Sequence, residues 1–141
     1  MPTPRTPAPR QVVERLLAAV TGRRPADAAA LYADDAVVTH PFAPSDAPLA
    51  GRAALAEHFA AGPAVPREMR ADDVVIHQTV DPEVVVAEFT YRGRATDTGR
   101  ECATPCVFVV RVRDGLIVRS RDYAHHEAMA RALEHAPVDT G

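Results

Sequence analysis

The amino-acid sequence predicts a single α+β domain, with helices in its first part and an antiparallel sheet in the rest. Apolar residues recur at helical spacing from Gln11 to Val20, whereas four runs of strand-like alternation follow one another between residues 71 and 124. The turn sequences Asp81–Pro82 and Asp114–Gly115 join two pairs of these runs and are typical of hairpins. This order predicts that the helices cover one face of a meandering sheet.

Three helices are expected before the strand-rich part. The first ends at Gly22 and has one apolar stripe, formed by Val12, Val13, Leu16, Leu17 and Val20. A short second helix begins at Pro25, a residue favoured in the first helical turn, and continues through Tyr32. The third spans about residues 51–61 and ends at Gly62–Pro63.

The strands are expected at about residues 36–41, 71–80, 83–94, 103–113 and 116–124, followed by a last helix at about 125–134. Four prolines among residues 1–9 indicate a disordered lead-in. The expected organisation is therefore a disordered segment over residues 1–9, one domain over 10–136 and a flexible tail over 137–141.

The composition argues against several classes of protein. All 16 basic residues are arginines, so the chain has no lysine for a Schiff base. The net charge of −3, with arginines interleaved among acidic residues, argues against nucleic-acid binding. No apolar run approaches the roughly 20 residues of a membrane span, and the first residues lack the apolar core of a secretory signal. We therefore expect a cytoplasmic protein without nucleic-acid or membrane partners.

Sequence motifs for cofactors and metals are missing as well. Neither serine lies in a GxSxG turn, and there is no glycine-rich loop for phosphates. Cys102 and Cys106 lie in one predicted strand, roughly 13 Å apart when it is extended, which is too far to share a metal. We expect both to be small core or edge residues, and His125–His126 to begin a surface helix. The sequence predicts no metal site and no cofactor.

The segment LYADDAVVTHPF, residues 31–42, contains the first candidate site residue. Alternate residues of a strand share a face, so His40 lies with Val38 on an apolar face. Pro41 cannot donate a hydrogen bond to a neighbouring strand, so it indicates a strand end and places His40 at the rim of a pocket. A packed or solvent-satisfied histidine is the alternative interpretation.

The last predicted strand contains the second candidate. Alternate residues of this strand share a face, and one face carries an aspartate among mostly apolar residues. Its members are Leu116, Val118, Ser120, Asp122 and Ala124. Burial raises the pKa of a carboxyl group unless a donor or cation satisfies it. The alternative is that Asp122 caps the following helix.

Glu88 is the third candidate. It shares a face with Val84 and Val86 in the central predicted strand, so it is either buried with a shifted pKa or paired with an arginine such as Arg111. His77, by contrast, is expected on a solvated face.

The segments LYADDAVVTHPF, AGRAALAEHFA, VVVAEFTYRGRATDTG and VVRVRDGLIVRSRDY together resemble the SnoaL-like polyketide cyclases. They are similar more widely to the ketosteroid-isomerase-like proteins of the nuclear transport factor 2 fold. The resemblance covers about Val12 to Leu133. It implies a cone-shaped, curved antiparallel sheet (a cystatin-like roll) wrapped on the N-terminal helices, with a C-terminal helix and an apolar pocket. It also implies a homodimer through the outer sheet face, where Val107, Val109 and Phe89 would need cover.

The resemblance also assigns roles to residues. His40 falls where ketosteroid isomerases have an aspartate general base, and Asp122 falls where SnoaL-like cyclases have an aspartate that acts as acid and base. Leu16 stands in place of the helix tyrosine of the isomerases, and their strand aspartate is replaced by an apolar or proline residue between Pro105 and Phe108. That donor pair forms the oxyanion hole of those enzymes. Steroid isomerisation of that type is therefore not expected.

The function implied by the resemblance is a cofactor-independent enzyme of secondary metabolism, acting as a cyclase, isomerase or dehydratase on a hydrophobic, carbonyl-bearing polyketide-like or polycyclic molecule. His40 would be the principal base, Asp122 would protonate the developing oxyanion or orient His40, and Glu88 would be an accessory polar group. The residues expected to contact the substrate are Leu16, Tyr32, Val38, Phe42, Phe59, Phe108, Val118 and Ser120. The alternative is a non-catalytic small-molecule-binding or dimerisation module of the same fold.

Overall fold

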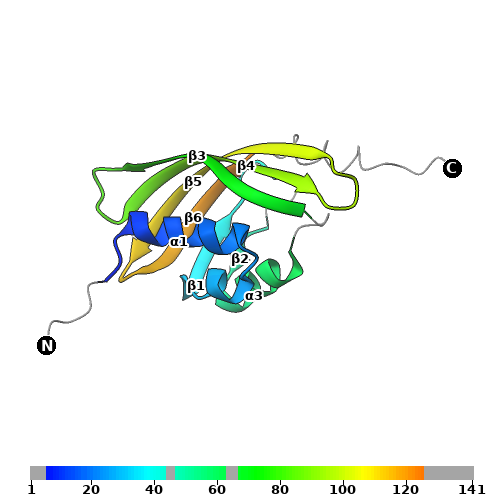
Figure 1. Ribbon diagram of the computed structural model, residues 1–141. Helices are drawn as coiled ribbons and strands as arrows, with labels where there is room; N and C mark the ends of the chain where they lie inside the picture. Colours follow the sequence, from blue (N-terminus) through cyan, green and yellow to red (C-terminus); the bar gives the residue numbers. More distant parts are fainter. Residues whose placement is uncertain (1–5, 44–46, 63–66, 126–141) are drawn as a thin grey trace, which may run out of the picture.

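Figure 1 shows the computed structural model, which describes residues 6–43, 47–62 and 67–125. Helices α1 (Pro9–Thr21) and α2 (Pro25–Ala29) precede strand β1 (Tyr32–Thr39), and strand β2 (Leu49–Ala50) and helix α3 (Arg52–Ala61) follow it. Four long strands complete the chain: β3 (Arg67–Gln78), β4 (Val84–Ala95), β5 (Glu101–Arg113) and β6 (Leu116–Ala124). The predicted helix over 125–134 and tail over 137–141, and most of the predicted lead-in, lie outside the described residues.

The six strands form one curved sheet in the order β2-β1-β6-β5-β4-β3. The predicted antiparallel meander is confirmed, because β3, β4, β5 and β6 pair antiparallel in sequence order. Strand β1 adds a parallel pair with β6, so the sheet is mixed. This parallel pairing places the end of β1 beside the end of β6, although some 80 residues separate them in the sequence.

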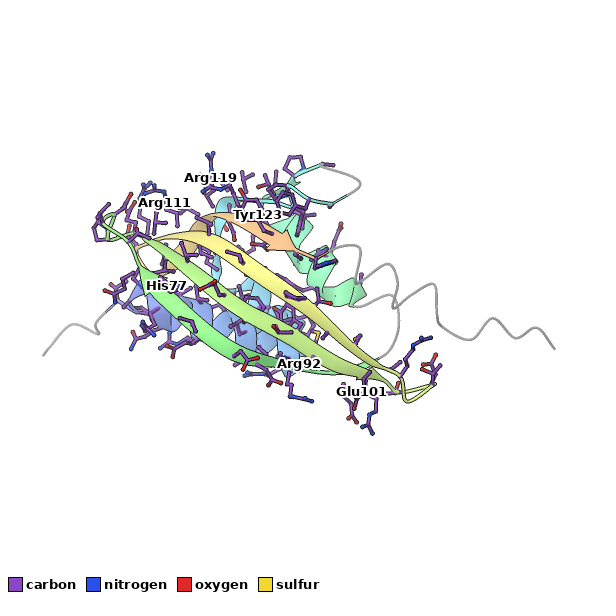
Figure 2. The ribbon with its side chains drawn as sticks, turned by 90° about the horizontal axis from the view of Figure 1, so that it is seen from above. His77, Arg92, Glu101, Arg111, Arg119 and Tyr123 are labelled. Carbon is purple, nitrogen blue, oxygen red and sulfur yellow. The ribbon has the colours of Figure 1, made fainter. Side chains whose placement is uncertain are left out.

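The helices cover one face of the sheet, which we call the inner face (Figure 1). The predicted apolar stripe of α1 is buried there, with Val12 and Val13 fully inaccessible to solvent. The inner face of β4 and β5 supplies the opposing core side chains: Val85, Ala87, Phe89, Cys106, Phe108, Val110 and Val112. Figure 2 shows the opposite, outer face, on which no described helix lies.

The boundary between α2 and β1 differs from the sequence prediction. Helix α2 ends at Ala29, and Tyr32 begins β1 instead of ending the helix. Tyr32 pairs with Ile117 of β6, and both residues are buried in the core. The gain from burying these two large side chains outweighs the local helical pattern, since β-sheet preference depends strongly on such packing.

Strand β6 contains an irregularity that changes which residues face inward. Arg111 pairs with Arg119, but the next residue, Val112, pairs with Ile117, so Val118 is an extra residue in a β-bulge. Ile117 therefore shares the inner face with Ser120 and Asp122, and the expectation from strict alternation that Ile117 lies on the other face was wrong.

Candidate functional site

The structure brings His40 and Asp122 together at the ends of β1 and β6. Val38 pairs with Ser120 and Thr39 with Arg121, so His40 follows β1 directly beside Asp122. The His40 Nε2 and Asp122 Oδ2 atoms are 3.9 Å apart, and their side chains are 25% and 12% exposed. This separation is an ion-pair distance rather than a direct hydrogen bond. The two groups are thus close enough to act on one bound molecule.

Asp122 is buried in an environment that favours its protonated form. Burial raises the pKa of its carboxyl group to about 7, and the hydrogen bond donated by the Ser120 hydroxyl counteracts that increase only in part. Desolvation penalises the charged carboxylate, and this effect dominates here. Asp122 can therefore hold or release a proton near neutral pH, as an acid/base group must.

Helix α3 attaches to β1 and brings a second histidine, His58, near His40. Its start is fixed on β1, because the Arg52 side chain donates to the carbonyl of Tyr32 at 2.8 Å and contacts Asp34 at 2.9 Å. The helix thereby places the His58 ring 6.2 Å from the His40 ring, measured between centroids. Burial lowers the pKa of His58, so a neutral imidazole is favoured beside His40.

Two phenols lie on the inner face near Asp122. Tyr32 opens β1, and Tyr91 lies on β4, two residues beyond Phe89, with which its ring makes an edge contact at 4.8 Å. Burial is the largest cause of the raised pKa of both hydroxyls, and the charge of Asp122 raises both further. Both phenols are therefore neutral hydrogen-bond donors at physiological pH.

Cys106 lies within the same polar group. Burial raises the pKa of its thiol to about 12, the charge of Asp122 adds to this increase, and a backbone hydrogen bond from Tyr91 reduces it. The thiol donates to the carbonyl of Thr104 at 3.4 Å. A neutral, buried thiol is a poor nucleophile, which agrees with the expectation of a small core residue.

Glu88 does not join this site, and the expectation that it is an accessory group there was wrong. It lies on the outer face, where its side chain is 55% exposed and contacts His77 Nε2 at 2.5 Å. The alternative partner Arg111 is bound instead by Glu83 and Asp81. Alternation could not separate the two faces of β4, because both carry apolar residues there, and the inner one bears Val85, Ala87 and Phe89.

The expected substrate contacts divide between three environments. On the inner face or in the core beneath it lie Leu16, Tyr32, Val38, Phe108 and Ser120, all buried, together with the half-buried Phe59. Val118 is half-buried at the bulge. Phe42 is 68% exposed and stacks edge-on against Tyr123, with ring centroids 5.0 Å apart. Phe42 is therefore not part of the core around Asp122.

A hollow of about 460 Å³ lies beside Phe42, and neither His40 nor Asp122 lines it. Glu88, Thr90, Val107 and Tyr123 line it together with several neighbouring residues. It is open and lies mostly over outer-face side chains, whereas the His40–Asp122 pair is buried on the inner side. We place the candidate site at the pair, because the buried titratable groups lie there.

Sequence reasoning missed Tyr91 and His58. Tyr91 follows Ala87 and Phe89 at the strand period, so its place on the inner face could be inferred only after the phase of β4 was known. His58 comes close to His40 only through the attachment of α3 to β1, for which the sequence has no local signal.

Among residues 6–43, 47–62 and 67–125, no three histidine, cysteine or acidic side chains are grouped as they would be to hold a metal ion. In the same ranges, no helix has the length and apolar character needed to cross a membrane.

The architecture of N-terminal helices against a curved sheet, with a few polar groups inside, defines a ketosteroid-isomerase-like fold. The family model of the SnoaL-like domain matches residues 13–120, and the chain belongs to this family.

Two curated relatives match parts of the chain. The chain is 30% identical over 95 residues to the uncharacterized protein YesE of Bacillus subtilis, covering 66% of this chain and 65% of the relative. It is 34% identical over 77 residues to an uncharacterized PhzA/B-like protein of Pseudomonas aeruginosa, covering 52% and 55%. The chain thus spans less than two thirds of either relative.

Solved structures show the same fold. A proposed isomerase from Bacillus subtilis superposes with a TM-score of 0.81 at 24% identity, covering 90% of this chain and 93% of that chain. A proposed polyketide cyclase from Pseudomonas putida has a TM-score of 0.73 at 20% identity, covering 89% and 97%. At these identities the similarity establishes the fold alone.

Proposed function

We propose that this protein is a cofactor-independent acid/base enzyme that moves a proton on a hydrophobic, carbonyl-bearing molecule. The observation that carries this proposal is the pair of His40 and Asp122, 3.9 Å apart, in which burial raises the pKa of the carboxyl group to about 7. A carboxyl group whose pKa lies near neutral pH, with an imidazole beside it, is an arrangement that general acid/base chemistry requires.

The proposed reaction uses each group once. The His40 imidazole removes a proton from the carbon next to the carbonyl. The electron pair of that C–H bond becomes a C=C bond, and the π pair of the carbonyl moves onto its oxygen. Protonated Asp122 then donates its proton to the substrate, or stays in place and orients the imidazolium. Positioned groups of this kind contribute about 10² to 10⁴ in rate. The apolar surroundings, among them Val38 and Phe108, suit a polyketide-like or polycyclic substrate.

The names of the structural neighbours support this reaction class. A proposed isomerase, a proposed polyketide cyclase and a phenazine biosynthesis-related protein of Pseudomonas aeruginosa share the fold. Isomerisation, cyclisation and dehydration all begin with the same proton removal beside a carbonyl. These names support the proposal of a role in secondary metabolism.

The test is the exchange of carbon-bound protons with D₂O, followed by NMR on 2-tetralone, an apolar ketone with acidic protons. His40→Gln and Asp122→Asn keep the approximate shape of each side chain and remove its titration. Each change should lower the exchange rate about 10²-fold or more, and the double change little further, because groups acting as one unit are non-additive. Rates within about threefold of the parent, with the fold intact, would contradict the proposal and favour a binding module.

We also propose that two copies associate through the outer sheet face. Val86, Val107 and Val109 are half-buried there although no described helix covers them. Phe89, which was expected beside them, lies on the inner face instead and is 3% exposed. A mass near 15.1 kDa by light scattering at micromolar concentration would contradict the association. Val109→Asp should shift a dimer toward that mass, because it places a charge in the apolar surface.

A further inference from the structure

Helix α3 presents a second imidazole beside the proposed base. The His58 ring lies 6.2 Å from the His40 ring, measured between centroids, and the two planes are inclined by 42°. The same ring contacts Phe59 edge-on, with centroids 5.6 Å apart. The proposed acid/base pair of His40 and Asp122 does not include His58. A titratable group at this distance is close enough to exchange a proton with His40 through one water molecule.

The position of His58 is set by the packing of α3 on β1. The Gly51 amide at the helix start donates to the carbonyl of Ala36 at 2.7 Å. Near the helix end, the Phe59 ring packs against the ring of Tyr32, with centroids 5.8 Å apart. Contacts at the start and at the end of the helix thus hold its last turn, which carries His58, in place.

Two titratable neighbours of His40 differ in their access to solvent. The Asp122 side chain is 12% exposed and accepts a hydrogen bond from the Ser120 hydroxyl, so a proton passed to it stays inside the protein. His58 is an exposed residue, although its ring lies beside His40. A proton that reaches His58 can therefore leave to bulk water.

Two opposing effects act on the imidazole of His58. Partial burial of the ring against its neighbours lowers its pKa below the ordinary value of 6.5, which favours release of a proton. His58 also lies in the last turn of α3, where the partial negative charge of the helix end stabilises a transient imidazolium. A relay group must accept a proton and release it again, and these two effects meet both needs.

A bound substrate creates the need for such a route. The His40 side chain is 25% exposed, and a molecule seated at the His40–Asp122 pair would cover that exposed part. The imidazolium formed when His40 takes a proton would then lose direct contact with solvent and return the proton to the same carbon. A reaction in which this proton must leave, or be replaced by one from water, needs an exit from His40.

We propose that His58 relays protons between His40 and solvent, through one water molecule between the two rings. This inference rests on the proposed function and adds the step that restores its base. The His40 imidazolium gives its N–H proton to the bridging water, and that water gives a proton to a ring nitrogen of His58. The His58 imidazolium then releases a proton to bulk water, so both imidazoles return to their neutral forms and one proton has left. His58 acts through His40 and touches no reacting atom.

The experiment measures exchange of the carbon-bound protons of 2-tetralone in weakly buffered D₂O with His58→Gln and His58→Ala. Glutamine keeps a hydrogen-bonding side chain but does not titrate. Both variants should lower kcat for exchange about tenfold or more and change KM little, because an imidazolium that is not restored returns its proton to the same carbon. Imidazole buffer should restore exchange in His58→Ala, where it can enter the vacated space, whereas the bulkier buffer MOPS should not.

His77→Gln is the matched control, because His77 is an exposed histidine on the outer face (Figure 2). It should leave the exchange rate and its buffer dependence equal to those of the parent. His40→Gln should stay slow in imidazole buffer, because glutamine fills the place of the missing base. A purely structural role of His58 would not make exchange depend on imidazole rather than MOPS.

Two results would overturn the relay alone. One is exchange in His58→Gln within about threefold of the parent. The other is a slow His58→Ala that imidazole accelerates no more than it accelerates the parent. In both cases exchange would still depend on His40 and Asp122, so the acid/base proposal would stand. Exchange that is unaffected by His40→Gln, or no exchange by the parent, would contradict the acid/base proposal and the relay with it.

Discussion

Carboxyl groups on the inner and outer sides of this sheet have pKa values that are shifted in opposite directions. Asp122 on the inner face has a pKa that burial raises to about 7, with a single side-chain donor, Ser120. Glu83, at the start of β4, bonds to Arg113 at 2.9 Å and to Arg111 at 2.9 Å, and these hydrogen bonds lower the pKa of its carboxyl group to about 2. Burial thus raises the pKa of one carboxyl group, whereas arginine partners lower the pKa of the other.

The difference shows that burial and neighbouring charges, not residue type, determine whether a carboxyl group here holds a proton near neutral pH. Arginines cluster on the outer face, where Arg111 and Arg119 appear in Figure 2, and water screens their ion pairs. The inner side supplies no described guanidinium to Asp122. A carboxyl group held by two arginines stays ionised and stabilises a turn, whereas a desolvated one exchanges its proton near neutral pH.

The largest expected effect comes from placing a new carboxylate on each face at neighbouring positions. Val110 is fully buried on the inner face, and Val109, the residue before it, is half-buried on the outer face opposite Arg121. Val110→Asp should cost about 4 kcal/mol or more, or prevent folding, because the charge would be buried without a partner. Val109→Asp should retain the fold.

Urea unfolding followed by circular dichroism measures both variants. If Val109→Asp destabilises the monomer as much as Val110→Asp does, the assignment of inner and outer faces is wrong. Comparing the two at equal, low protein concentration separates the effect on folding from the effect on association.

A smaller effect is expected in the pH dependence of stability. Between about pH 4 and pH 7 the folded state holds a proton on Asp122, whereas the unfolded state has released it. The contribution of Asp122 to the free energy of unfolding therefore falls as pH rises through this window, by at most about 1.4 kcal/mol per pH unit. Above the folded pKa, both states are ionised and the dependence ends.

Asp122→Asn is the matched control for this measurement. It removes the titration, so the stability difference between Asp122→Asn and the parent should increase in favour of the variant from pH 4 to pH 7. A difference that is constant over this range, by urea unfolding at each pH, would show that the pKa of Asp122 is not raised.

The smallest effect is expected for the outer-face pair His77 and Glu88. The two side chains are 51% and 55% exposed, and their contact of 2.5 Å is open to solvent. A double-mutant cycle with His77→Ala and Glu88→Ala should give a coupling of about 0.2 to 1 kcal/mol. A coupling above about 2 kcal/mol would mean that the outer face is covered at this point.

Strand alternation was sufficient to place His40 and Asp122, because each lies among apolar neighbours on a short strand end. Alternation also predicted the meander, and helical spacing of apolar residues predicted the buried stripe of α1; the structure confirms both. The parallel pairing of β1 with β6 was not predicted, since pairing of segments so far apart in the sequence has no local signal. The bulge at Val118 was not predicted, and Asp122 still faces inward because the extra residue precedes it.

Glu88 and Tyr91 show where the sequence is not sufficient. Both faces of β4 are apolar near its start, so the alternation has no unique phase, and one choice places Glu88 inside while the other places Tyr91 there. Ala87 and Phe89 pack in the core, so the residues in phase with them, including Tyr91, face inward and Glu88 faces outward. His58 depends on the bonds of Arg52 to β1, which only the folded structure shows.

The central claim, that burial on the inner face keeps a proton on one carboxyl group near neutral pH, is tested most directly by NMR. Carboxyl carbons of protein labelled with ¹³C-aspartate and ¹³C-glutamate are titrated, with Asp122→Asn and Glu83→Gln used to assign the two signals. We expect midpoints near pH 7 for Asp122 and near pH 2 for Glu83. Midpoints near pH 4 for both groups, the ordinary range for exposed carboxyls, would contradict the account.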